Sequence, residues 1–270
     1  MKVFLVILSL IISVLTFSQG NPASKSRAEK KQERKTKIEA LIRQQEEGAL
    51  IYDQQQVGGM RINTDGWSFF YEKGIFKNIK LTNLFSLEFG EKKHPKEKKL
   101  NSTFQNGGLI QFGNPYVFGK SNIFYQLKPT VGQQRVIGGK TNKNGVVVQW
   151  LYAGGLSLGM ERPYYLRIPD NSLEGFKLVQ VKNEEALNEI NNETQGTGLR
   201  YGWNQLKIIP GMHAKTAIRF DYGRFNEVVT ALEVGVNLEA YSRKINIMLL
   251  TDNRQIFFNS YISLLFGIRK

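Results

Sequence analysis

The stretch NSYISLLFGIRK, residues 259–270, decides the fold class. The alternate positions from 258 to 268 are occupied by Phe, Ser, Ile, Leu, Phe and Ile. This alternation indicates a β-strand with one nearly continuous apolar face. In a chain that starts with an export signal, such a C-terminal strand is typical of the closing strand of a bacterial outer-membrane β-barrel. The last strand of an exported soluble sandwich would alternate in the same way, so that alternative stays open.

Residues 1–18 are predicted to be a cleavable signal peptide. One lysine, Lys2, precedes an apolar run too short for a comfortable transmembrane helix. Thr16 and Ser18 place small residues at −3 and −1, so Gln19 is the expected mature N-terminus. The chain has no cysteine and therefore no thiol to carry a lipid anchor. No later apolar stretch approaches the length of a membrane helix, which excludes a helical membrane protein.

The formal net charge of +14 bears on the expected partners. In a cytosolic protein this charge would suggest nucleic acid. Because the chain carries an export signal, anionic lipid phosphates are the expected partner and nucleic acid is not.

Residues 19–55 are predicted to form a basic periplasmic α-helix and a linker. Between residues 25 and 43 there are eight Lys or Arg against three Glu, and no aromatic residue. Ile38, Leu41 and Ile42 make a short apolar stripe at helical spacing, and Arg43 lies beside it. These four residues are the predicted partner-binding surface of an arm that docks on an envelope partner or on inner-leaflet phosphates. A leader that only spaces the barrel from the signal is the alternative.

Residues 56–270 are predicted to form an all-β, antiparallel transmembrane barrel of about eight strands, with ten possible. A hairpin turn at 64–66 between two short strands, 57–63 and 67–73, gives the even number that bacterial barrels show. The expected short connections are residues 73–78, 138–145 and 223–227, and the expected long ones are 91–120, 162–210 and 242–254. Barrels keep short turns in the periplasm and long loops outside, so both termini are expected to be periplasmic. One or two helical turns are expected at 184–191.

Several sequence blocks resemble those of an uncharacterised family of bacterial outer-membrane β-barrels. They are NTDGW at 63–67, KHPKE at 93–97, YVFGKSN at 116–122, KNGV at 143–146, RPYY at 162–165 and PGMHAK at 210–215. The resemblance runs from Gly58 to the C-terminus. It implies a fold and a location, but no catalytic residue.

Alternation also predicts which charged side chains face the barrel interior. The inward set carries both signs: Glu88, Lys128, Glu161, Lys215, Arg219, Asp221, Glu233 and Glu239. The interior of an eight-stranded barrel is just filled by side chains, so opposite charges there are expected to pair and leave no open channel.

His213 is the candidate for catalysis, with Asp221 as its partner. Both are predicted to point inward, where a lipid-A deacylase or acyltransferase could use them. No serine lies at matched spacing, which favours a histidine held in an internal hydrogen-bond network.

The segment from residue 92 to 99 is the candidate for lipid and phosphate binding. Its five lysines are Lys92, Lys93, Lys96, Lys98 and Lys99. They would repel a cation from His94 and Glu97, so no metal and no cofactor is predicted. A solvated loop is the plain alternative to a surface that binds lipopolysaccharide phosphates.

The leading interpretation is a closed outer-membrane barrel that acts as a structural or accessory component of an envelope complex. Outer-membrane lipids and lipopolysaccharide are its expected partners. A lipid-modifying enzyme that uses His213 is the alternative.

Overall fold

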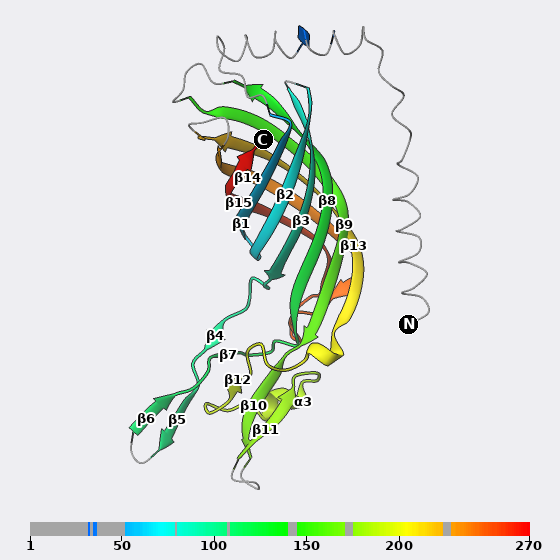
Figure 1. The fold of residues 1–270 in the computed structure, drawn as a ribbon. Coiled ribbons are helices and arrows are strands. Elements are labelled where there is room, and N and C mark those ends of the chain that lie inside the picture. Colours follow the sequence, from blue (N-terminus) through cyan, green and yellow to red (C-terminus); the bar gives the residue numbers. More distant parts are fainter. Residues whose placement is uncertain are drawn as a thin grey trace. The chain divides into compact units, whose positions relative to one another are not determined.

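Eight antiparallel strands close into a barrel in the computed structural model (Figure 1). The structure describes Gln32, Lys35, Thr36 and residues 52–78, 80–106, 109–139, 145–170, 175–223 and 228–270. The barrel strands are β1 (Gln54–Asn63), β2 (Gly66–Asn78), β3 (Leu81–Lys92), β8 (Asn122–Gly138), β9 (Val147–Pro163), β13 (Lys207–Asp221), β14 (Val228–Ile245) and β15 (Arg254–Arg269). The predicted fold class and the lower of the two strand numbers are confirmed.

The C-terminal strand β15 closes the ring. One of its edges pairs with β14, and the other pairs with β1 from Gln55↔Arg269 to Asn63↔Tyr261. Every barrel strand therefore has two neighbours, so no edge is left with unpaired backbone groups.

The two faces of β15 follow the predicted alternation. Phe258, Ile262 and Leu264 are exposed on the outer face, whereas Tyr261 and Leu265 are buried inside. Because successive side chains of a strand point to opposite faces, one register places the whole apolar series outside.

The first hairpin is longer than its sequence suggests. β1 and β2 pair from Asn63↔Gly66 to Gln54↔Ile75, so the segment 73–78 belongs to β2. The expectation of a short turn there is wrong, and the connection to β3 lies at Lys80 instead. Regular pairing on both sides outweighs the turn tendency of Gly74 and Asn78.

The long connections carry small sheets of their own, which lie beyond one end of the barrel strands in Figure 1. Between β3 and β8 these are β4 (Lys99–Leu100) with β7 (Tyr116–Val117), and β5 (Thr103–Asn106) with β6 (Leu109–Phe112). Between β9 and β13 lie β10 (Tyr165–Asp170), β11 (Gly175–Gln180), β12 (Gln195–Gly196), α3 (Glu185–Asn188) and the 3-10 turn η1 (Trp203–Gln205). We call this the long-loop end. The helical turn expected at 184–191 is confirmed as α3.

Part of the long-loop end packs around an apolar cluster. Leu166 and Val181 are fully buried, and Tyr116, Tyr125 and Tyr164 surround them. The Tyr164 hydroxyl accepts a hydrogen bond from the backbone N–H of Val117 at 3.2 Å. Burial raises the pKa of Tyr164, so this hydroxyl stays protonated. The connections after β3 and after β9 are thus held together.

The chain divides into two compact units, Met1–Glu46 and Glu47–Lys270. In the first unit the structure describes Gln32, Lys35 and Thr36, which are helical. The predicted signal peptide and the predicted partner-binding residues Ile38, Leu41, Ile42 and Arg43 lie outside the described residues.

Among the described residues, no helix has the length and apolar character needed to cross a membrane.

Candidate functional site

The barrel interior, which we call the lumen, is filled with charged side chains. All members of the predicted inward set are buried: Glu88, Lys128, Glu161, Lys215, Arg219, Asp221, Glu233 and Glu239. Buried charged side chains that the alternation argument missed include Arg61, Glu72, Lys92 and Arg269. Arg61 and Glu72 lie on the first hairpin, for whose strands the sequence analysis assigned no inward face.

Eight of these side chains, together with Asp65, form one continuous series of ion pairs, which we call the ion-pair chain. Its members alternate in sign in the order Glu72, Arg219, Glu233, Arg61, Glu88, Lys128, Glu239, Lys92, Asp65. The links measure 2.7 Å for Glu72–Arg219 and 2.6 Å for Arg219–Glu233. At the other end, Lys92 lies 2.6 Å from Asp65 and 3.1 Å from Glu239. Residues from strands far apart in the sequence thereby connect across the lumen.

Hydroxyl groups complete the coordination of the carboxylates. Tyr261 donates to Glu233 at 2.9 Å, Ser68 donates to Glu88 at 2.9 Å, and Tyr241 donates to Glu239 at 3.1 Å. A buried ion pair is tolerated only when further hydrogen bonds satisfy its remaining lone pairs. The ion-pair chain meets this condition, and it connects the strands of the barrel wall from inside.

The candidate catalytic residues are not brought together. His213 and Asp221 lie eight positions apart on β13, which at the rise of a strand corresponds to roughly 27 Å. Asp221 pairs instead with Arg269. His213 is buried, and its Nε2 lies 2.9 Å from the Thr130 hydroxyl. The predicted internal hydrogen-bond network is confirmed for His213.

The expectation that no serine accompanies His213 is wrong. Ser157 Oγ lies 3.1 Å from His213 Nδ1, because β9 and β13 pair Ser157 with Gly211 and Gly155 with His213. The long connection between the two strands hides this register from the sequence. Ser157 is fully buried, so the pair has no access to an external substrate in this conformation.

The lysines of the loop after β3 divide into two groups. Lys92 is 1% exposed and belongs to the ion-pair chain, so the prediction that it contacts lipid phosphates is wrong. Position 92 is still part of β3, where its side chain follows the inward face. Lys93, Lys96, Lys98 and Lys99 are exposed. We call these four the lysine loop.

Glu97, the carboxylate within this segment, is engaged by groups outside the lysine loop. Glu97 accepts a hydrogen bond from the backbone N–H of His94 at 2.9 Å and pairs with Lys120 at 2.6 Å. Burial and the nearby Arg254 cation lower the pKa of His94, so its imidazole is neutral at pH 7. The positive charge of this surface therefore comes from the lysines.

In the part of the chain that the structure describes, no group of three or more His, Asp or Glu residues is placed to hold a metal ion.

Similarity to known proteins is confined to distant solved structures. No protein-family model matches the chain. No curated protein matches it. The attachment invasion locus protein Ail of Yersinia pestis, in complex with the heparin analogue sucrose octasulfate, is 10% identical over 82% of this chain and all of its own, with a TM-score of 0.38. Neisserial surface protein A is 8% identical over 80% of this chain and 94% of its own, with a TM-score of 0.37.

Proposed function

We propose that the protein is a closed β-barrel of the bacterial outer membrane that serves as a structural or accessory component of an envelope assembly. The ion-pair chain across the lumen is the observation that carries this proposal. It fills the space through which a solute would pass, and the Ser157–His213 pair is buried inside the barrel.

The outer surface supports the membrane location. Large apolar side chains are exposed on strands around the barrel, among them Ile62, Phe69, Leu87, Leu156 and Phe266. A soluble monomer rarely exposes such a continuous apolar area, whereas a transmembrane barrel needs it as its lipid-facing belt. With the long-loop end outside the cell, both ends of the described barrel, Gln54 and Arg269, would lie on the periplasmic side.

The lysine loop would contact lipopolysaccharide phosphates at the outer leaflet. Four exposed ammonium groups lie on one short segment at the long-loop end, directly after β3. A basic side chain near an anionic membrane surface contributes roughly 1 kcal/mol. Four of them would favour lipopolysaccharide over neutral lipid without a preformed cavity.

The N-terminal segment would supply the contact with the envelope partner, through Ile38, Leu41, Ile42 and Arg43. Affinity purification in mild detergent tests this. The parent should retain an envelope protein that a variant with Ile38, Leu41 and Ile42 changed to Ser loses. Equal recovery with both chains would refute the arm.

Conductance in planar bilayers tests the closed lumen. The purified protein should insert without stable unitary currents, because the buried side chains of the ion-pair chain lie across the lumen. A porin inserted under the same conditions provides the positive control. Large, stable currents from the parent protein would overturn the proposal.

A second candidate, a lipid-modifying enzyme, is favoured by one observation. The 3.1 Å separation of Ser157 Oγ and His213 Nδ1 is that of a nucleophile and its base. It predicts that His213→Ala alters lipid-A acylation in cells while the barrel keeps its heat-modifiable gel mobility. Identical lipid-A mass spectra from knockout and parent would remove this candidate.

A further inference from the structure

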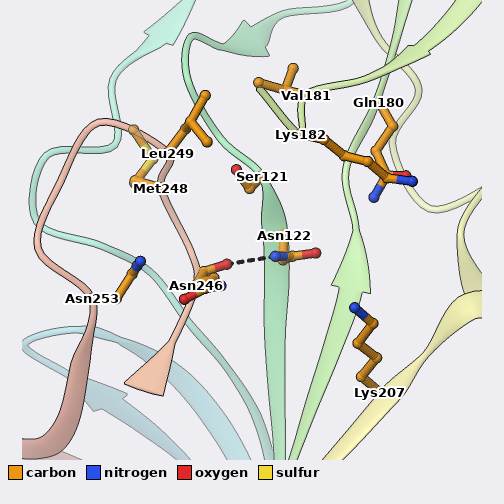
Figure 2. Close-up of a pocket in the computed structure, with 10 residues that line it drawn as sticks. All are labelled: Ser121, Asn122, Gln180, Val181, Lys182, Lys207, Asn246, Met248, Leu249 and Asn253. Atoms are coloured by element: carbon orange, nitrogen blue, oxygen red, sulfur yellow. Dashed lines mark hydrogen bonds between the residues drawn. The ribbon is translucent and has the colours of Figure 1, made fainter. Parts of the chain in front are cut away.

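A small pocket at the long-loop end combines cationic and neutral polar groups. It has a volume of about 220 Å³ and lies where the start of β8, the residues after β11, the start of β13 and the connection between β14 and β15 meet. Figure 2 shows Ser121 and Asn122 in the middle of the pocket, with Lys182 and Lys207 on one side and Asn253 on the other. We call it the outer pocket.

The Ser121 hydroxyl is the first indication of a ligand. Ser121 is 9% exposed, and its Oγ is buried without a hydrogen-bond partner. Its backbone is fully engaged: the N–H donates to Ile247 O at 2.9 Å, and the carbonyl accepts from Tyr164 N at 2.9 Å. The hydroxyl is therefore held in place at the pocket wall while its own bonding capacity is unused. Buried polar groups of this kind normally have a partner.

Asn122 and Asn246 form the fixed polar floor. Asn122 Nδ2 donates to Asn246 O at 2.6 Å, the dashed contact in Figure 2. Asn246 N in turn donates to Glu161 Oε1 at 2.9 Å. The amide oxygen of Asn122 is thus set by these contacts and remains available as an acceptor for a ligand hydroxyl.

Lys182 and Lys207 provide the charge. Both are exposed, and neither forms an ion pair with any described residue. Glu161, which lies opposite Lys207 in the β9–β13 pairing, is already bound by Arg243 at 2.8 Å and by Asn246 N. None of the residues that line the pocket is acidic. An anion at this position would meet two uncompensated ammonium groups.

We propose that the outer pocket binds a phosphorylated or sulphated saccharide. The two lysines suit the anionic group, and Ser121, Asn122 and Asn253 suit sugar hydroxyls. The volume is below the roughly 300–1,000 Å³ of sites for drug-sized ligands, so the pocket would admit a single sugar ring. This site is separate from the lysine loop and does not depend on the function proposed above.

Calorimetric titration of the lipid-free barrel in detergent tests the pocket, with glucose 6-phosphate as the probe. The parent should bind glucose 6-phosphate at least tenfold more tightly than either glucose or inorganic phosphate, because only the phosphorylated sugar engages both halves of the site. Absence of binding of all three soluble probes at millimolar concentrations, together with absence of lysine-dependent binding of lipopolysaccharide aggregates, would overturn the proposal, whatever the result of the conductance experiment.

Two variants and a matched control locate the site. Lys182→Gln with Lys207→Gln should weaken glucose 6-phosphate binding at least tenfold, whereas Lys93→Gln with Lys96→Gln, which removes the same charge, should not change it. Equal losses in both pairs would refute a built site. Ser121→Ala should weaken binding about threefold without lowering the stability of the unliganded barrel, since the hydroxyl has no partner there.

The source of the saccharide is decided by comparing soluble and lipid-borne ligands. Losses with Lys182→Gln and Lys207→Gln that appear with soluble glucose 6-phosphate identify a free sugar phosphate. The same losses confined to lipopolysaccharide aggregates identify a lipid headgroup. If the binding of neither ligand depends on these lysines, the proposal is overturned.

Discussion

Replacing Arg219 by methionine should destabilise the barrel strongly, because it removes one link of the ion-pair chain and leaves a buried carboxylate alone. The Arg219 guanidinium contacts both oxygens of Glu72, at 2.7 and 3.0 Å, and Glu233 at 2.6 Å. Glu233 keeps Arg61 and Tyr261 in the variant. Glu72 is 1% exposed and has no other ion-pair partner among the described residues.

The expected cost follows from Glu72. Removing one partner of a buried ion pair typically costs about 3–5 kcal/mol, since the remaining charge stays buried and uncompensated. Glu233 keeps its other contacts, so the loss in the free energy of unfolding should lie near the lower end, about 3 kcal/mol. Arg219→Met combined with Glu72→Gln should recover a coupling free energy of about 0.5–3 kcal/mol.

Urea unfolding in lipid vesicles, followed by tryptophan fluorescence and by heat-modifiable gel mobility, measures both variants. Lys177→Met is the control, because Lys177 pairs with Glu189 at 3.3 Å on the exposed surface. An exposed pair contributes at most about 1 kcal/mol. The stabilising role of the ion-pair chain would be refuted if Arg219→Met unfolded with the same free energy as the parent. It would also be refuted if the double variant were no more stable than Arg219→Met alone.

Three further predictions concern other parts of the barrel. A methyl group at Gly159 would approach the Phe124 ring to 2.7 Å, so Gly159→Ala should lower the free energy of unfolding by about 1–3 kcal/mol, while Gly58→Ala, which meets no atom within 4 Å, serves as its unaffected control. Changing Lys93, Lys96, Lys98 and Lys99 to Gln should lower lipopolysaccharide retention, most of all at low salt, because salt screens such contacts and the Debye length is already about 8 Å at physiological ionic strength. Lys92→Gln should instead lower the stability of the barrel. Loss of retention with Lys92→Gln and loss of stability with the other four changes would contradict the division of these lysines. The folded state lowers the pKa of His94 below the ordinary histidine pKa of 6.5. The free energy of unfolding should therefore fall as the pH drops below 6.5, because the unfolded chain takes up the proton more readily. His94→Gln should flatten that part of the pH–stability curve, and an unchanged slope would contradict the prediction.

The local alternation of side chains was sufficient to predict the architecture and much of the lumen. The series from Phe258 to Ile268 identified the closing strand, and the same period assigned Glu88, Lys128 and Glu233 to the interior. These predictions succeed because a strand has a period of two that depends on neighbouring residues alone. The length of the first hairpin was not predicted correctly. Gly74 and Asn78 suggest a turn, but pairing with β1 and β3 keeps this segment extended.

Only the tertiary structure decided which inward groups meet. Arg61 and Glu233, or Ser157 and His213, become neighbours through the register of strands joined by long connections, and the sequence carries no local signal for that register. The outer pocket is a further case, because Ser121, Lys182 and Asn253 come from three separate connections. Alternation along a strand therefore determined whether a residue faces inward, while closure of the barrel and the stagger of its strands determined what it touches there.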